Sequence, residues 1–191
     1  MQKRLLIPTL LVLAALPVTA MAQEEMQHDK MEHAEMTHEH GVGMASIQPL
    51  YDQFKGWLIA SADQMPQEHY GFKPSADVRS FGQVLGHVAN ASYMFCSAAL
   101  GEAAPSMPNL EEVTAKAELV KGIKAAFAYC DKAYQIPEEN AMESVTFFGR
   151  EGSKLWVLNF NAMHDAEHYG NLVTYMRMKG MTPPSSQRGE M

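Results

Sequence analysis

The sequence of residues 80–88 reads SFGQVLGHV, and it joins a helix start to a histidine on the apolar face of that helix. Ser80 and Gln83 form the S-x-x-Q pattern of a capping box, in which two side chains satisfy free backbone amides at a helix N-terminus. His87 follows Val84 by three residues, so both side chains lie on the same face of the expected helix. This stretch therefore predicts a capped helix that carries an imidazole along its buried side.

Three further segments carry apolar side chains at helical spacing, and glycine or proline residues separate them. A shorter stretch, residues 145–148, reads VTFF before Gly149 and is interpreted as an extended segment, half of a small hairpin. The sequence shows no other clear sheet pattern. We therefore expect an all-α fold, a four-helix bundle, with helices over about residues 46–63, 81–100, 109–134 and 153–179.

The chain has 191 residues, of which 47% are hydrophobic, and this fits one globular core with attached ends. Its 22 acidic residues exceed its 15 basic residues, which gives a formal net charge of -7. Binding to DNA or RNA depends on clustered lysine and arginine side chains that neutralise phosphates. The charge balance therefore disfavours a nucleic-acid partner. The unusual counts are 15 methionines and 8 histidines.

The first 22 residues have the three parts of a secretory signal peptide. Lys3 and Arg4 give a positive start, residues 5–16 form an apolar run, and small residues precede the expected cleavage position after Ala22. The apolar run is shorter than the roughly 20 residues of a membrane span, and an uncleaved anchor is the alternative interpretation. We expect a periplasmic or secreted protein with no stable membrane anchor after signal cleavage.

Residues 23–45 are expected to form a flexible tail, and they contain three copies of a five-residue unit, M-x-H-x-x. A period of five matches neither a helical stripe nor strand alternation. Thioether sulfur and imidazole nitrogen together form a ligand set that suits copper. The alternative is an acidic, solvated linker with incidental methionine and histidine. The candidate ligands of this second site are Met26, His28, Met31, His33, Met36, His38 and His40.

The two cysteines, Cys96 and Cys130, both fall in expected helices. In an exported protein a disulfide between them could persist and would join one helix to another. Their separation in space decides whether they can pair. A disulfide and two separate buried thiols are both open interpretations.

Three histidines fall on inward faces of the expected helices. His164 and His168 are four residues apart, so they project from one side of the last helix, and His87 lies on the apolar face of the second. Two such imidazoles and a third from a facing helix can form a three-nitrogen metal site with positions open for water or substrate. The alternative is three hydrogen-bonded core histidines, but burying unpaired imidazoles is unfavourable. His69, in a loop, has no assigned role.

Residues 164–168, HDAEH, also match the H-x-x-E-H pattern of inverted zinc proteases. Such an enzyme needs the glutamate in the site and another ligand well downstream. Glu167 falls toward the side of the helix that carries Arg177 and Thr174, rotated away from the two histidines, and 23 residues follow His168. A protease is therefore disfavoured.

The order and spacing of four stretches point to one known family: residues 70–74 (YGFKP), 80–88 (SFGQVLGHV), 164–172 (HDAEHYGNL) and 178–184 (MKGMTPP). Over about residues 46–184 the chain resembles the DinB-like family of small metal-binding four-helix bundles, which is distinct from the DNA polymerase of that name. Residues 185–191 are then a short loose C-terminal tail.

The resemblance implies an up-down-down-up bundle with a long crossover, and often a homodimer. It also implies a divalent metal ion, commonly zinc or nickel, held by the histidines at positions His87, His164 and His168. Related proteins include transferases and isomerases that use low-molecular-weight thiols.

The sequence is compatible with two functions. The first is a metal-dependent transferase or hydrolase acting on a small-molecule substrate, with Asp165, Asn161 and Tyr175 as candidate groups around the metal ligands. The second is a non-catalytic periplasmic metal-binding or metal-handling protein, in which the tail captures ions and the bundle holds one. A metal-free interaction bundle is a third alternative.

Overall fold

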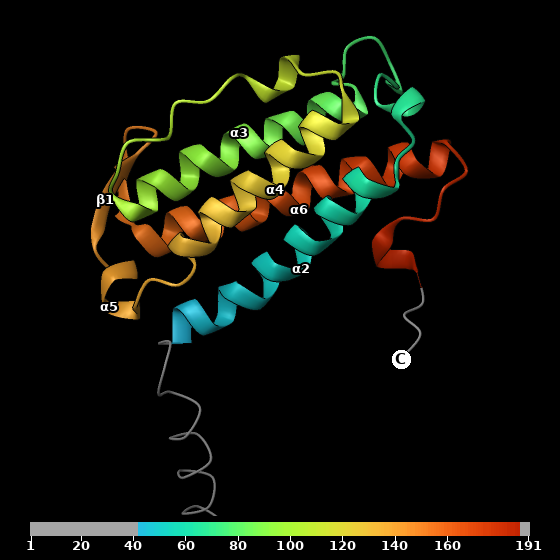
Figure 1. The fold of residues 1–191 in the computed structure, drawn as a ribbon. Helices are drawn as coiled ribbons and strands as arrows, with labels where there is room; N and C mark the ends of the chain where they lie inside the picture. Colours follow the sequence, from blue (N-terminus) through green and yellow to red (C-terminus); the bar gives the residue numbers. More distant parts are fainter. Residues whose placement is uncertain (1–41, 188–191) are drawn as a thin grey trace, which may run out of the picture. The chain divides into compact units, whose positions relative to one another are not determined.

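The computed structural model describes residues 42–187, and four long helices dominate this part of the chain (Figure 1). Helices α2 and α6 run in one direction, and α3 and α4 run in the other. Because α3 and α4 point the same way, residues 101–115 cross back along the length of the bundle to connect them. This arrangement confirms the expected all-α, up-down-down-up bundle with a long crossover. The four helices are α2 (Val42–Gln64), α3 (Phe81–Leu100), α4 (Lys116–Ala133) and α6 (Lys154–Met178).

A small hairpin stands between α4 and α6, as the sequence of residues 145–148 indicated. After the single turn of α5 (Glu138–Ala141), strand β1 (Ser144–Phe147) pairs antiparallel with β2 (Arg150–Ser153). The two-residue loop consists of Phe148 and Gly149, with φ angles of 50° and 72°. Two positive φ angles in a two-residue loop define a type I′ turn, which matches the twist of the strands.

The first helix begins at Val42, four residues before the expected start at Ser46. The hydroxyl of Ser46 donates to the Val42 carbonyl within the helix, so it is not a cap. The carboxylate of Glu138 instead accepts the free amides of Gly43 and Met44, at 3.2 and 2.9 Å. A cap supplied from 94 residues away leaves no local sequence pattern, which explains the difference.

The third helix begins at Lys116 and not near Asn109. The Asn109 side chain does cap a turn, since it accepts from the amide of Glu111, but that turn is a separate 3-10 segment, Leu110–Glu112. The chain then becomes extended at Val113 before α4 starts. The helix expected over residues 109–134 is therefore shorter at its start, because residues 110–115 form a separate turn and an extended link. By contrast, the capping box of Ser80 and Gln83 on α3 is present in full.

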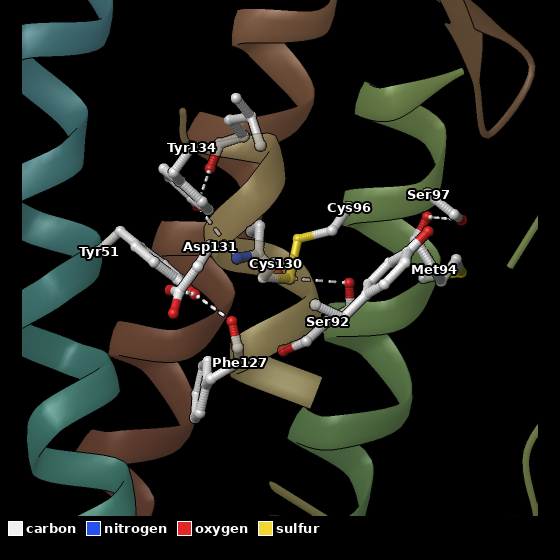
Figure 2. Close-up of a disulfide and its surroundings, with 12 residues drawn as sticks. Tyr51, Ser92, Met94, Cys96, Ser97, Phe127, Cys130, Asp131 and Tyr134 are labelled. Atoms are coloured by element: carbon white, nitrogen blue, oxygen red, sulfur yellow. Dashed lines mark hydrogen bonds between the residues drawn. A yellow bond between two sulfur atoms is a disulfide. The ribbon is translucent and has the colours of Figure 1, made fainter. Parts of the chain in front are cut away.

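Helices α3 and α4 are joined by a disulfide between Cys96 and Cys130, drawn in Figure 2. Both residues are fully buried, and their Cα atoms lie 5.2 Å apart. Tyr51 of α2 stacks on Tyr134 on the other side of α4, with ring centroids 3.7 Å apart. The disulfide and the aromatic stack therefore fix α4 between two neighbours. The pairing decides between the two interpretations of the cysteines.

The chain remains in contact with the bundle after α6 ends. Gly180 adopts a φ of 72°, and the following 3-10 turn spans Pro184–Ser186. The amide of Ser185 donates to the hydroxyl of Tyr169 at 2.8 Å, so the contacts extend beyond residue 184. Over residues 42–187, none of the helices has the combination of length and apolar composition that a membrane crossing requires. The expected signal peptide, residues 1–22, and residues 188–191 lie outside the described part.

Candidate metal centre

Three imidazoles from α3 and α6 converge on one point. The Nε2 atom of His164 lies 3.1 Å from Nε2 of His87 and 3.1 Å from Nε2 of His168. His164 and His168 stand one turn apart on α6, and His87 faces them from α3. One nitrogen from each ring falls within a cluster 4.8 Å across. The structure therefore brings together the three histidines that the sequence pattern selected.

The spacing of these nitrogens fits a shared metal ion better than mutual hydrogen bonds. One imidazole nitrogen has either a proton or a lone pair in the ring plane, so Nε2 of His164 cannot donate to one neighbour and accept from the other. Nitrogens bound tetrahedrally at about 2.0–2.1 Å from a metal would be roughly 3.3–3.4 Å apart. The two distances that meet at Nε2 of His164 are both 3.1 Å, close to that value, and the ligand atoms of all three rings lie within 4.8 Å of one another. Three nitrogen ligands leave at least one coordination position open.

Glu111 fixes the orientation of His87 from outside the cluster. Its Oε1 atom accepts a hydrogen bond from Nδ1 of His87 at 2.8 Å, and its Oε2 atom accepts from Nε of Arg79 at 2.9 Å. With the proton of the neutral ring on Nδ1, the lone pair of Nε2 points toward His164 and His168. A carboxylate on the far nitrogen of a ligating histidine is the usual way to fix its tautomer and raise its basicity.

The environment favours neutral imidazoles, which is the form that binds metal. Burial, followed by the neighbouring His168 and His87, lowers the pKa of His164 to about 3. Burial and His87 also lower the pKa of His168. Burial alone would raise the pKa of Glu111, but hydrogen bonds from Arg79 and His87 outweigh it and hold that pKa below its usual value. Two of the ligating rings, His164 and His168, are therefore held in the neutral form, and an ionised carboxylate lies behind His87.

A glycine on α3 allows Glu111 to reach His87. A Cβ atom at Gly86 would collide with the backbone carbonyl of Leu110 and would lie 2.6 Å from the backbone nitrogen of Glu111. The missing side chain thus lets the crossover pack directly on α3. The side chain of Asn90, one turn after Gly86, accepts from the Leu110 amide at 3.1 Å and fixes the crossover at this position along α3.

The Nδ1 atoms of His164 and His168 have weaker hydrogen-bond support than Nδ1 of His87. Asn171 lies 3.4 Å from Nδ1 of His168 through its side-chain amide. If the proton of His168 is on Nδ1, the amide oxygen of Asn171 must face it, and a flip of this amide provides that arrangement. Nδ1 of His164 is buried and has no hydrogen-bond partner within residues 42–187.

The candidate groups around the ligands differ from those that the sequence suggested. Asp165 and Asn161 are fully buried in the core and lie 3.4 Å from each other, and neither hydrogen-bonds a histidine of the cluster. Tyr175 donates to the backbone carbonyl of Arg79, the residue that holds Glu111, and does not hydrogen-bond a histidine of the cluster within residues 42–187. Asp165 follows His164 by one residue, about 100° around the helix, which turns it into the core.

Glu111 was missed because its role depends on the path of the crossover. The helix expected from about residue 109 placed Glu111 near a helix start and not beside His87, whereas Glu111 belongs to a turn that Asn109 caps. A cavity of about 420 Å³ opens on Glu111 between residues 70–83 and the crossover. Since Glu111 contacts Nδ1 of His87, this cavity lies behind the ring and not on the side where the three Nε2 atoms meet.

The remaining predicted residues lie apart from the cluster. Glu167 is exposed on α6, which agrees with the argument against a protease. His69 belongs to the 3-10 turn Gln67–His69 and not to the cluster. The candidate copper ligands lie outside the described residues: Met26, His28, Met31, His33, Met36, His38 and His40.

Comparison with known proteins agrees with the fold. The chain is 25% identical over 129 residues to the uncharacterised protein YjoA of Bacillus subtilis, which covers 63% of this chain and 80% of YjoA. The crystal structure of a DinB-like protein from Bacillus cereus has a TM-score of 0.65 at 17% identity, covering 72% of this chain and 93% of that one. The structure of YjoA itself has a TM-score of 0.56 at 23% identity, covering 75% and 99%. A family model described as the DinB superfamily matches residues 55–172. The chain therefore belongs to the DinB superfamily.

Proposed function

We propose that this protein is an exported metal-dependent enzyme, a transferase or hydrolase, that binds a divalent ion through His87, His164 and His168. The observation that carries the proposal is the pair of 3.1 Å separations that meet at Nε2 of His164. Three neutral nitrogen donors suit zinc or nickel. A three-ligand site with an open position is typical of catalytic metals, whereas structural zinc sites are usually closed by four protein ligands.

The bound ion would supply Lewis-acid polarisation of a donor atom on a small molecule. The residues of the chain prepare that site in a fixed order. Arg79 holds Glu111, and Glu111 holds the proton of His87 on Nδ1, so that Nε2 is free to bind. The low pKa of His164 keeps its ring unprotonated in mildly acidic solution. The site therefore needs little rearrangement on binding the ion.

A second function, non-catalytic metal handling, is supported by the three M-x-H-x-x copies before residue 42. In that function the tail would capture copper and the bundle would hold a separate ion. The two functions differ in whether the ion in the bundle exchanges ligands with small molecules.

Cobalt can report on the site in the bundle, because its visible spectrum changes with coordination, and a separate copper titration of the same two proteins reports on the tail. We would load the protein, with and without residues 23–41, with Co²⁺ and then add azide. A cobalt spectrum that survives tail deletion and changes with azide supports an open site in the bundle. A spectrum that azide leaves unchanged contradicts the enzyme, and copper binding that disappears with the tail supports metal handling.

A further inference from the structure

Phe148 occupies a backbone position that phenylalanine rarely adopts. It is the first loop residue of the β1–β2 hairpin, and its φ of 50° lies in the left-handed region. Type I′ turns strongly prefer asparagine or glycine there, because a Cβ atom is crowded by its own backbone. Asparagine at this position would make the same turn with less strain. The aromatic ring is therefore not explained by the turn itself.

The Phe148 ring is also exposed to solvent, although it is anchored among other rings. Its side chain is 62% exposed, and its centroid lies 4.2 Å from that of Phe147 and 6.3 Å from that of Phe160. The buried ring of Phe95 lies beneath, 6.4 Å from Phe148. A strained backbone that presents an exposed apolar ring is doubly unfavourable for stability. Such positions occur where binding or catalysis requires the side chain.

This aromatic cluster continues directly into the metal centre. Phe160 and His164 are one turn apart on α6, so Phe160 lies about 6 Å along the helix axis from the histidine. Phe95 contacts both, with centroids 5.1 Å from Phe160 and 5.5 Å from His164. On α3, Met94 lies seven residues after His87 and therefore on the same face. Since α3 and α6 are antiparallel, Met94 and Phe160 are both displaced from the histidines toward the hairpin.

We propose that the exposed side chains of Phe148, Phe160 and Met94, which we call the apolar ledge, bind the apolar or aromatic body of a small molecule whose polar head ligates the metal. This inference rests on the proposed function and adds a substrate class to it. The ledge determines which substrates bind well, and the histidines bind the common head group.

The size of the ledge fits a small molecule better than a second copy of the chain. Phe148, Phe160 and Met94 are 62%, 36% and 37% exposed. For side chains of about 200 Å² this is on the order of 300 Å². A stable protein interface buries about 800 Å² on each partner. A ring of a small molecule can cover the ledge while its head group stays within reach of the metal.

The test uses two hydroxamates that share one metal-binding head and differ by one phenyl group, acetohydroxamate and 2-phenylacetohydroxamate. Their dissociation constants are measured from the visible spectrum of the Co²⁺-loaded protein. We expect the phenyl compound to bind about tenfold more tightly to the wild type, as an aromatic contact with area burial would give. In Phe148→Asn the preference should fall to about twofold, while acetohydroxamate binds as before.

The same variant separates binding from structure. Phe148→Asn suits the type I′ turn, so its melting temperature should equal or exceed that of the wild type. A ring kept only for packing would instead make the variant less stable. Leu50→Asn is the matched control, because Leu50 is 49% exposed on α2 and should leave the phenyl preference unchanged. Phe160→Ala is a second variant, and it should also reduce the preference.

Three results would overturn the apolar ledge: a wild type without phenyl preference, the same preference in Phe148→Asn, or a wild-type dimer that Phe148→Asn converts to monomer. The last result would assign the ledge to a subunit interface. Failure of the proposed function looks different, because acetohydroxamate would then leave the cobalt spectrum unchanged or cobalt would not bind. In that case the ledge loses its metal-bound head group and this inference fails as well.

Discussion

His87 and Glu111 lie 24 residues apart in sequence and meet at 2.8 Å, Nδ1 to Oε1. The contact joins helix α3 to the crossover that follows it, and it lies on the side of the ring away from the other two histidines. One carboxylate thus orients a metal-binding nitrogen that it does not touch. The arrangement depends on the close approach of the Leu110–Glu111 backbone to Gly86.

Glu111→Ala should weaken metal binding without unfolding the protein. Loss of a carboxylate behind a ligating histidine typically reduces metal affinity by about 10- to 100-fold. The measurement is competition with a chromophoric chelator. Glu112→Ala is the matched control, because Glu112 follows on the same turn and its carboxylate accepts from Asn109 and not from His87. Equal affinity of Glu111→Ala and wild type would show that His87 needs no such support.

Gly86→Ala, on α3, should also disturb the contact between His87 and Glu111. The added methyl group would collide with the Leu110 carbonyl, so the crossover must move away from α3. Overpacking of this kind is destabilising by about 1–3 kcal/mol. We expect both a lower unfolding free energy in urea and a weaker metal affinity. Gly56→Ala, on α2 with open space at the Cβ position, should leave the metal affinity unchanged and should not lower the unfolding free energy, since alanine is the better helix former.

The metal-free protein should lose stability as the pH falls below the usual histidine range. The pKa of His164 is lowered from 6.5 to about 3 in the folded chain, chiefly by burial and then by His168. Between these values the unfolded chain binds a proton that the folded chain does not, so unfolding becomes more favourable with acid. Melting temperatures from pH 7 to 4 should therefore fall, and more steeply for wild type than for His164→Leu. Parallel curves would contradict the lowered pKa.

Removal of the disulfide should destabilise the bundle substantially. Cys96 and Cys130 close a loop with a sequence separation of 34, which corresponds to about 4 kcal/mol in the chain-entropy treatment. The double variant Cys96→Ala, Cys130→Ala should lose about that much unfolding free energy in urea and unfold at a lower urea concentration. A reductant should lower the midpoint of the wild type and leave that of the double variant unchanged. A wild type that is insensitive to reductant when unfolded would argue against the bond.

The sequence was informative wherever the determining interactions are local. The capping box of Ser80 and Gln83 and the four-residue spacing of His164 and His168 need only one helix, and both were predicted. The convergence of His87 on that pair followed from the apolar face of α3. The four-helix bundle was expected from the helical spacing, and the up-down-down-up order with its long crossover came from the family resemblance.

Two of the missed contacts involve residues distant in sequence. Glu138 caps α2 from 94 residues away, and Glu111 reaches His87 only because the crossover returns along α3. The exposed Phe148 is a further case, because its strain depends on the two-residue hairpin loop. The periodicity and spacing of residues along the sequence do not reveal contacts or backbone angles of this kind.

Metal analysis of the purified protein tests the central claim most directly. The protein is expressed from residue 42 onward, beside a triple variant with His87→Ala, His164→Ala and His168→Ala. Both proteins are equilibrated with zinc and passed through a desalting column. Their zinc content is then measured by inductively coupled plasma mass spectrometry. All three histidines lie after residue 42, so the shortened protein keeps the whole site. It lacks the methionines and histidines of the tail, which would otherwise compete for the metal. The three-histidine site predicts about one zinc per chain in the parent and essentially none in a triple variant with an unchanged helical circular dichroism spectrum. Equal metal in the two proteins would contradict it.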